Sequence, residues 1–139
     1  MSWRRWVFFD YLGEDGVNAA TPSKEFGKGK LRTKLEARLD SKILHLEASR
    51  REQWDTELFA ALDEREDECG GLFEIRMPFG NIQHRLLVCE GPGENKLTIL
   101  YWALEVQDEF KPQTACREAK ARQRRLFANP NSRRRHLEG

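Results

Sequence analysis

The sequence predicts a single α+β domain in which helices flank one face of a small, mostly antiparallel sheet. Three observations support this fold class. The chain has 139 residues, of which 39% are hydrophobic and 34% charged, so it can bury one core but is short for two domains. Hydrophobic residues recur at helical spacing in some segments and at the two-residue spacing of strands in others. No repeat or long linker separates these segments. The predicted order of elements is β-α-α-β-β-β-α.

The first half of the chain predicts one strand and two helices. Residues 6–11 are rich in aromatic and β-branched side chains and end at a glycine-containing turn, as expected of a strand. A helix follows, because apolar residues recur at spacings of 4, 4, 4 and 3. They are Leu31, Leu35, Leu39, Ile43 and Leu46. A second helix is predicted from about residue 51 to residue 66, with Trp54, Leu58 and Leu62 on one side, and a pair of glycines ends it.

The second half of the chain predicts three strands. Apolar and charged residues alternate over residues 73–77, which indicates a half-buried strand. Residues 85–90 form the next strand, closed by a hairpin loop that contains two glycines and a proline. Residues 97–104 are apolar on both faces, so we expect this third strand near the centre of the sheet.

A basic helix is predicted to close the domain. Pro112 stands where a helix can begin, since its missing N–H costs nothing there. One narrow stripe of this helix allows close packing and consists of Cys116, Ala119, Gln123 and Leu126. Arg117, Lys120 and Arg124 share a neighbouring face. We expect residues 1–127 to form the domain and residues 128–139 to form a basic, flexible tail.

Composition argues against several classes of protein. Three widely spaced cysteines without a C-x-x-C pair argue against a disulfide framework and a zinc site, and fit a reducing cytoplasm. The apolar run near the N-terminus is too short for a signal peptide or a membrane span. The acidic run at residues 63–68 lacks ligand spacing and indicates a solvated face. Residues 27–30 do not complete a phosphate-binding loop, and no serine-nucleophile motif occurs. No metal or cofactor is therefore expected.

Charge is distributed unevenly along the chain. Residues 1–110 hold 15 Lys and Arg against 21 Asp and Glu, a net charge of −6, whereas residues 111–139 hold 9 basic and 2 acidic residues, a net charge of +7. The C-terminal part therefore suits a polyanion or an acidic partner, although a charged run is often only solvated.

The strands also predict a charged surface on the face away from the core. If residues 73–77 pair with residues 85–90, Arg76 and Arg85 lie on one surface, where guanidinium groups hold phosphates bidentately. The alternative is that Glu74 and Arg76 only form exposed ion pairs with their neighbours.

Three segments of the sequence carry a resemblance to a known family, namely residues 71–76, 84–87 and 97–102. Their order agrees with that family, as does the spacing from Pro112 to Ala119 and Arg122. In these features the chain resembles the RelE/HigB toxins, particularly their phage-derived branch. The resemblance spans about residues 31–127. It implies a RelE-like fold and the toxin component of a type II toxin–antitoxin system. Such proteins are ribosome-dependent mRNA endonucleases, in which the 2′-OH attacks the phosphodiester without a metal. The implied partners are mRNA, the ribosome and a small antitoxin, typically of the helix-turn-helix type, in the cytoplasm.

The resemblance also assigns roles to individual residues. Arg85 would stabilise the charge of the transition state, and Arg76 would hold phosphate or serve the structure. His84 would transfer a proton, unless it is a buried neutral histidine. Tyr101 and Trp102 would stack on a base, although Tyr101 also suits a core. The RNA-binding set on and near the last helix is Arg117, Lys120, Arg122, Arg124 and Trp102, while Lys111 joins the catalytic candidates.

Three departures from the family pattern keep a second function open. Val106 and Gln107 stand where the family has a pair of lysines, and Trp102 and Lys111 replace a histidine and a threonine. Either Lys111 and the last helix supply the cations of the missing lysine pair, or the nuclease activity is weak, altered or absent. The alternative function is therefore a catalytically inactive, phage-derived protein that binds an RNA or protein partner through its basic surface. A third hypothesis is a module whose basic tail docks an acidic protein.

Overall fold

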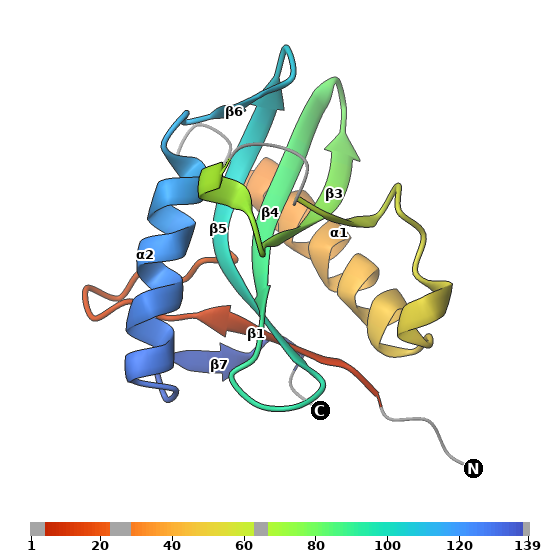
Figure 1. The fold of residues 1–139 in the computed structure, drawn as a ribbon. Coiled ribbons are helices and arrows are strands. Elements are labelled where there is room, and N and C mark those ends of the chain that lie inside the picture. Colours follow the sequence, from red (N-terminus) through yellow and green to blue (C-terminus); the bar gives the residue numbers. More distant parts are fainter. Residues whose placement is uncertain (1–4, 23–28, 63–66, 138–139) are drawn as a thin grey trace.

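The computed structural model describes residues 5–22, 29–62 and 67–137. These residues form two α-helices and one mixed, open sheet of seven strands, which confirms the α+β class (Figure 1). The strand order is β2-β3-β4-β5-β1-β7, and β6 pairs with the free part of β5. The strands are β1 (Val7–Tyr11), β2 (Phe59–Ala61), β3 (Phe73–Phe79), β4 (Ile82–Glu90), β5 (Lys96–Val106), β6 (Glu109–Lys111) and β7 (Arg133–Arg135). The helices are α1 (Gly29–Glu47) and α2 (Ala115–Ala128), with 3-10 turns η1 (Arg51–Gln53) and η2 (Asp67–Cys69).

The predicted strands of the second half form the centre of the sheet. β3, β4 and β5 pair in antiparallel order, and β1 lies parallel to β5. Because β5 is paired on both edges and apolar on both faces, its central position agrees with the prediction. Three of the seven strands, β2, β6 and β7, were not predicted as strands, and each is three residues long.

The two helices lie on opposite faces of the sheet, which corrects the expectation that helices flank one face (Figure 1). Two residues of β1 that lie three positions apart show the division. Phe8 stacks on Trp54, which follows α1, whereas Tyr11 lies under the guanidinium of Arg122 from α2. Side chains of a strand alternate between faces, so Phe8 and Tyr11 belong to different layers. We call the two sides the α1 face and the α2 face.

Helix α1 agrees with its predicted apolar stripe. Leu35, Leu39, Ile43 and Leu46 are buried, while Leu31 at the start of the stripe is 39% exposed. At the end of this helix Glu47 is buried as well, and its carboxylate accepts a hydrogen bond from the backbone N–H of Phe8 at 2.9 Å. This contact joins α1 to β1.

The predicted second helix, residues 51–66, is wrong over the residues that the structure describes. That segment contains η1, a turn at Asp55 and strand β2, and residues 63–66 lie outside the description. The side chain of Asp55 accepts a hydrogen bond from the N–H of Glu57, and its carbonyl accepts from Leu58 and Phe59. Such local bonds compete with a helix. Phe59 then pairs with Ile75 of β3.

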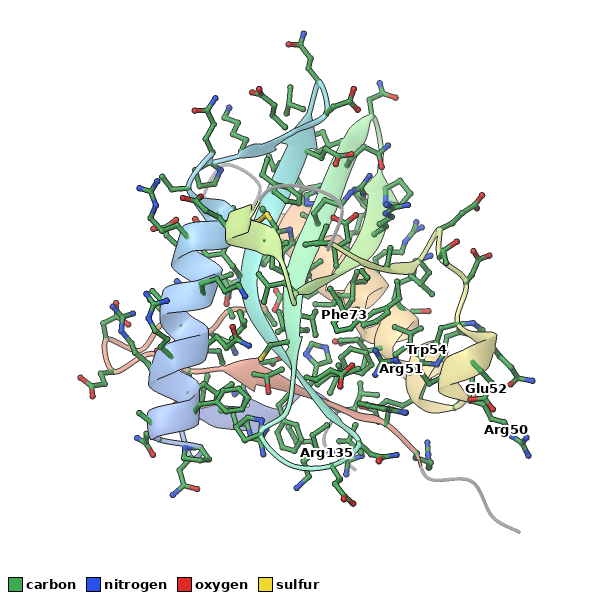
Figure 2. All side chains as sticks on the ribbon, viewed as in Figure 1. Arg50, Arg51, Glu52, Trp54, Phe73 and Arg135 are labelled. Carbon is green, nitrogen blue, oxygen red and sulfur yellow. A yellow bond between two sulfur atoms is a disulfide. The ribbon has the colours of Figure 1, made fainter. Side chains whose placement is uncertain are left out.

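Arg51 of η1 ties this segment to the sheet. Its guanidinium lies 4.3 Å from the centre of the Trp6 ring and 4.9 Å from that of Phe73, and it forms an ion pair with Glu90 at 2.9 Å. Figure 2 shows Arg51 close to Trp54 and Phe73, while Arg50 points away from the body of the protein.

Residues 133–135 were expected in a flexible tail, yet they form β7 and pair with residues 9–11 of β1. His136 extends this contact. Its Nδ1 lies 2.7 Å from the buried carboxylate of Asp10 and its Nε2 lies 2.7 Å from that of Asp40 on α1. The described part of the C-terminus is therefore held by both β1 and α1.

Two of the cysteines form a disulfide, which corrects the expectation that none is present. Cys69 of η2 is bonded to Cys116 of α2, 47 residues away in the sequence. The third, Cys89, is free and buried, and burial raises its pKa to about 12. Among the described helices, none has both the length and the apolar character needed to cross a membrane.

Candidate nucleic-acid interface

The two arginines predicted to share a surface do so. Arg76 of β3 and Arg85 of β4 are register partners on the α2 face. Between them lies the fully buried carboxylate of Glu74, with Oε1 2.8 Å from Nε of Arg76 and Oε2 3.9 Å from Nε of Arg85. Arg85 also donates to Glu105 of β5 at 3.1 Å. We call these four residues the Glu74–Arg85 cluster.

The Glu74–Arg85 cluster is electrically balanced, with two guanidinium groups and two carboxylates. Arg85 is only 7% exposed. Burial strengthens its pairing with Glu74 and Glu105, because water screens the charges less there. A phosphate approaching Arg85 would meet two carboxylates already in contact with it. Arg76 is more accessible, with its side chain one-third exposed, and it also donates to the carbonyl of Thr56.

His84 lies on the other face of the sheet from Arg85. It is 1% exposed, pairs with Met77 of β3 and accepts a hydrogen bond at Nδ1 from the indole N–H of Trp102 at 2.9 Å. Burial, reinforced by the charge of Arg85, lowers its pKa to about 4. The alternative of a buried neutral histidine therefore describes its surroundings better than an exposed proton carrier.

Trp102 is 6% exposed and its indole N–H is engaged with His84. Tyr101, the preceding residue, lies on the α2 face. The guanidinium of Arg122 is 4.9 Å from the centre of its ring, and burial together with a hydrogen bond to Glu118 raises the pKa of its hydroxyl to about 12. Neutral at physiological pH, this hydroxyl does not serve as a base.

Tyr101, Trp102 and Arg122 meet at a cleft of about 590 Å³ beside the loop after β1. Arg32 of α1 lines the same cleft, and sequence reasoning missed it. Arg122 is held in place, since its Nη1 donates to the carbonyl of Leu100 at 2.7 Å. The cleft thus brings together three of the residues predicted to contact RNA.

The solvent side of α2 carries the other predicted RNA-binding residues. Arg117 and Arg124 are exposed, and Lys120 lies between them on the same side of the helix. Arg117 pairs with Glu68 of η2 at 3.2 Å, and Lys120 donates to the carbonyl of Gly70. Arg124 has no carboxylate within ion-pairing distance in the described parts of the chain. We call Arg117, Lys120 and Arg124 the α2 ridge.

Two neighbours of the α2 ridge were missed. Arg125 is exposed and lines a second cleft of about 620 Å³ beside the loop after β1. Phe127 is 50% exposed, three residues after Arg124. An exposed aromatic ring beside arginines is a typical platform for an unpaired base, and the spacing of Arg124 and Phe127 was the available signal. The last candidate, Lys111, is exposed on β6, opposite Leu104.

The described residues hold no group of three or more His, Cys, Asp or Glu side chains placed to bind a metal ion. Comparisons of this chain with models of protein families, with curated proteins and with solved structures found no match. The assignment of a function therefore depends on the geometry above and on the sequence resemblance.

Proposed function

We propose that this protein is a relative of the RelE/HigB toxins that binds single-stranded RNA, with the exposed side of α2 as the contact surface. The order of the main elements supports the relationship. A strand and a long helix precede an antiparallel meander of three strands, and a basic helix follows it. The RelE-like order that the sequence resemblance implies, β-α-α-β-β-β-α, differs from this in having a second helix where the structure has η1 and β2.

One observation carries the RNA-binding proposal. On α2, Arg124 and Arg125 are exposed beside the half-exposed ring of Phe127. Cations of this kind attract phosphates, and the ring offers a face on which a base stacks for about 1 to 3 kcal/mol. Arg122, which stacks on Tyr101 at the nearby cleft, extends the same surface.

Binding without cleavage is the function that the contacts favour. A metal-free ribonuclease needs a proton acceptor, a proton donor and cations at the phosphate. Arg85 is engaged by Glu74 and Glu105, and His84 lies on the α1 face with a low pKa. The catalytically inactive alternative is therefore the leading proposal.

The mRNA endonuclease of a toxin–antitoxin system is the second candidate. It is favoured by the register pairing of Arg76 with Arg85 on the α2 face, since a toxin site of this kind requires arginines on one surface. In this candidate the ribosome, mRNA and an antitoxin are the partners, and Lys111 and α2 supply the cations that Val106 and Gln107 lack.

Fluorescence anisotropy with a labelled single-stranded RNA tests the leading proposal. The double variant Arg124→Ala/Arg125→Ala removes two phosphate contacts, so the slope of log affinity against log salt should decrease in magnitude by about 1.4. A matched control removes two exposed cations near the other helix, Lys34→Ala/Arg50→Ala, and should keep the wild-type slope. Equal losses in both variants, or binding that does not depend on salt, would contradict the proposal.

A translation reaction containing ribosomes and mRNA separates the two candidates. The leading proposal predicts intact mRNA with the wild-type protein. Specific cleavage products that disappear with Arg76→Ala would instead establish the endonuclease. The choice of Arg76 matters because its side chain is partly exposed, whereas the loss of buried Arg85 also affects folding.

A further inference from the structure

The 3-10 turn η2, together with Gly70 that follows it, packs against α2 through three separate contacts. The disulfide joins Cys69 to Cys116, the carboxylate of Glu68 pairs with Arg117, and the carbonyl of Gly70 accepts a hydrogen bond from Lys120. The residues that make these contacts are consecutive in the segment around η2 and lie close together in the sequence of α2. Two of the three cations of the α2 ridge are therefore engaged by η2 and Gly70.

The disulfide is the strongest of these contacts. The Arg117–Glu68 pair is exposed, with side chains 68% and 45% accessible, and exposed pairs of this kind stabilise little. Both sulfur-bearing residues, in contrast, are 3% exposed, and they line a cleft of about 870 Å³ together with Glu68 and Arg117. A small reductant therefore has an approach next to the bond that holds η2 in place.

We propose that the Cys69–Cys116 disulfide controls access to the α2 ridge, so that its reduction releases η2 and strengthens RNA binding. The inference rests on the proposed function, because the α2 ridge is part of the RNA contact surface. In the oxidised protein Glu68 places a carboxylate beside Arg117 and the Gly70 carbonyl occupies Lys120. After reduction these two cations become available to phosphates.

The reaction is a thiol–disulfide exchange with a dithiol as reductant. One thiolate of the dithiol attacks a protein sulfur and forms a mixed disulfide, and its second thiol completes the exchange. Two electrons and two protons pass to the protein. Cys69 and Cys116 become thiols, and the dithiol becomes its own disulfide.

RNA affinity of the full chain, measured with and without dithiothreitol, tests this switch. Two additional phosphate contacts predict that the reduced protein binds single-stranded RNA about 10-fold more tightly and that its salt slope increases by about 1.4. The variant Cys69→Ser/Cys116→Ser should bind like the reduced protein and ignore the reductant. Circular dichroism of each form checks that the fold is kept.

A second variant leaves the disulfide in place. Glu68→Gln removes the carboxylate beside Arg117 in the oxidised protein and should raise RNA affinity by a smaller factor. The matched control Glu52→Gln removes one exposed acidic charge from η1, away from α2, and should have no effect (Figure 2).

The outcomes separate this inference from the proposed function. Equal RNA affinity of the oxidised and reduced proteins overturns the switch and leaves RNA binding intact. Loss of the circular dichroism signal on reduction also overturns it, because the disulfide is then needed for the fold itself. Absence of RNA binding in both redox states overturns the proposed function, and the switch with it.

Discussion

The indole N–H of Trp102 on β5 donates a hydrogen bond of 2.9 Å to Nδ1 of His84 on β4. The two rings meet edge to face, with centroids 5.7 Å apart, on the buried α1 face of the sheet. This bond needs an unprotonated Nδ1, because a protonated imidazole has no acceptor. The folded state therefore selects the neutral form of His84.

His84 should make folding stability fall in mild acid. Burial lowers its pKa from 6.5 to about 4, so the unfolded chain binds a proton more readily between these values. The contribution of neutral His84 to the free energy of unfolding is fully present above pH 6.5. It decreases as the pH falls towards 4, by about 3 kcal/mol at most. Urea unfolding of wild type and His84→Gln across this range should show a shallower pH dependence in the variant. The control His45→Gln, at an exposed site, should follow wild type, and parallel curves for His84→Gln would contradict the assignment.

His136 should act in the opposite direction. Burial alone lowers its pKa, but its hydrogen bonds and charge interactions with Asp10 and Asp40 outweigh burial and raise it above 6.5. Its contribution is therefore complete below pH 6.5 and is lost as the pH rises through the folded-state pKa. The difference in unfolding free energy between wild type and His136→Gln should be largest near about pH 6 and shrink towards about pH 9. A difference that stays constant over this range would show that only packing was lost.

Truncation of Arg85 should destabilise the protein strongly. Arg85→Ala removes the ion pair of Glu105 at 3.1 Å and the second cation beside the buried carboxylate of Glu74, which keeps Arg76, and breaking a buried pair costs about 3 to 5 kcal/mol. The double variant Arg85→Met/Glu105→Met removes a whole pair and should cost less than the sum of the single variants. Urea titrations of Arg85→Met, Glu105→Met and the double variant measure this difference. Additive losses would mean that the Arg85–Glu105 contact contributes little.

Arg51 should contribute more to stability than its sequence neighbour. Its guanidinium contacts the rings of Trp6 and Phe73 and pairs with Glu90, so Arg51→Ala should lower the unfolding free energy by about 1 to 2 kcal/mol. Arg51→Lys should recover part of this loss. Arg50→Ala changes an exposed side chain and should stay within about 0.5 kcal/mol of wild type. Equal effects at both positions would argue against the ring contacts.

Elements with a long, regular hydrophobic pattern could be predicted from the sequence. The stripe from Leu35 to Leu46 defined α1, and the alternation at Phe73, Ile75 and Met77 defined β3. The pattern at Trp54, Leu58 and Leu62 also has helical spacing, yet Asp55 starts a turn and Phe59 pairs with Ile75. Tertiary pairing of a short strand overrode local propensity there.

The candidate site was predictable only where it follows from strand register. Placing Arg76 beside Arg85 required only that β3 and β4 pair. The carboxylate of Glu105 that engages Arg85 comes from β5, 20 residues later, and no spacing indicates that contact. The same holds for Cys69 and Cys116, which come together only once α2 lies against η2.

Strand β7 is an edge strand of the sheet and consists of three consecutive arginines. Its inner side pairs with β1. The unpaired side of an edge strand is a place where a second molecule can add its own strand. Like charge along this border opposes such growth, because an identical copy arriving there would bring its own guanidinium row into contact. The arginines of β7 should therefore disfavour edge-to-edge pairing of two copies of this chain at this strand.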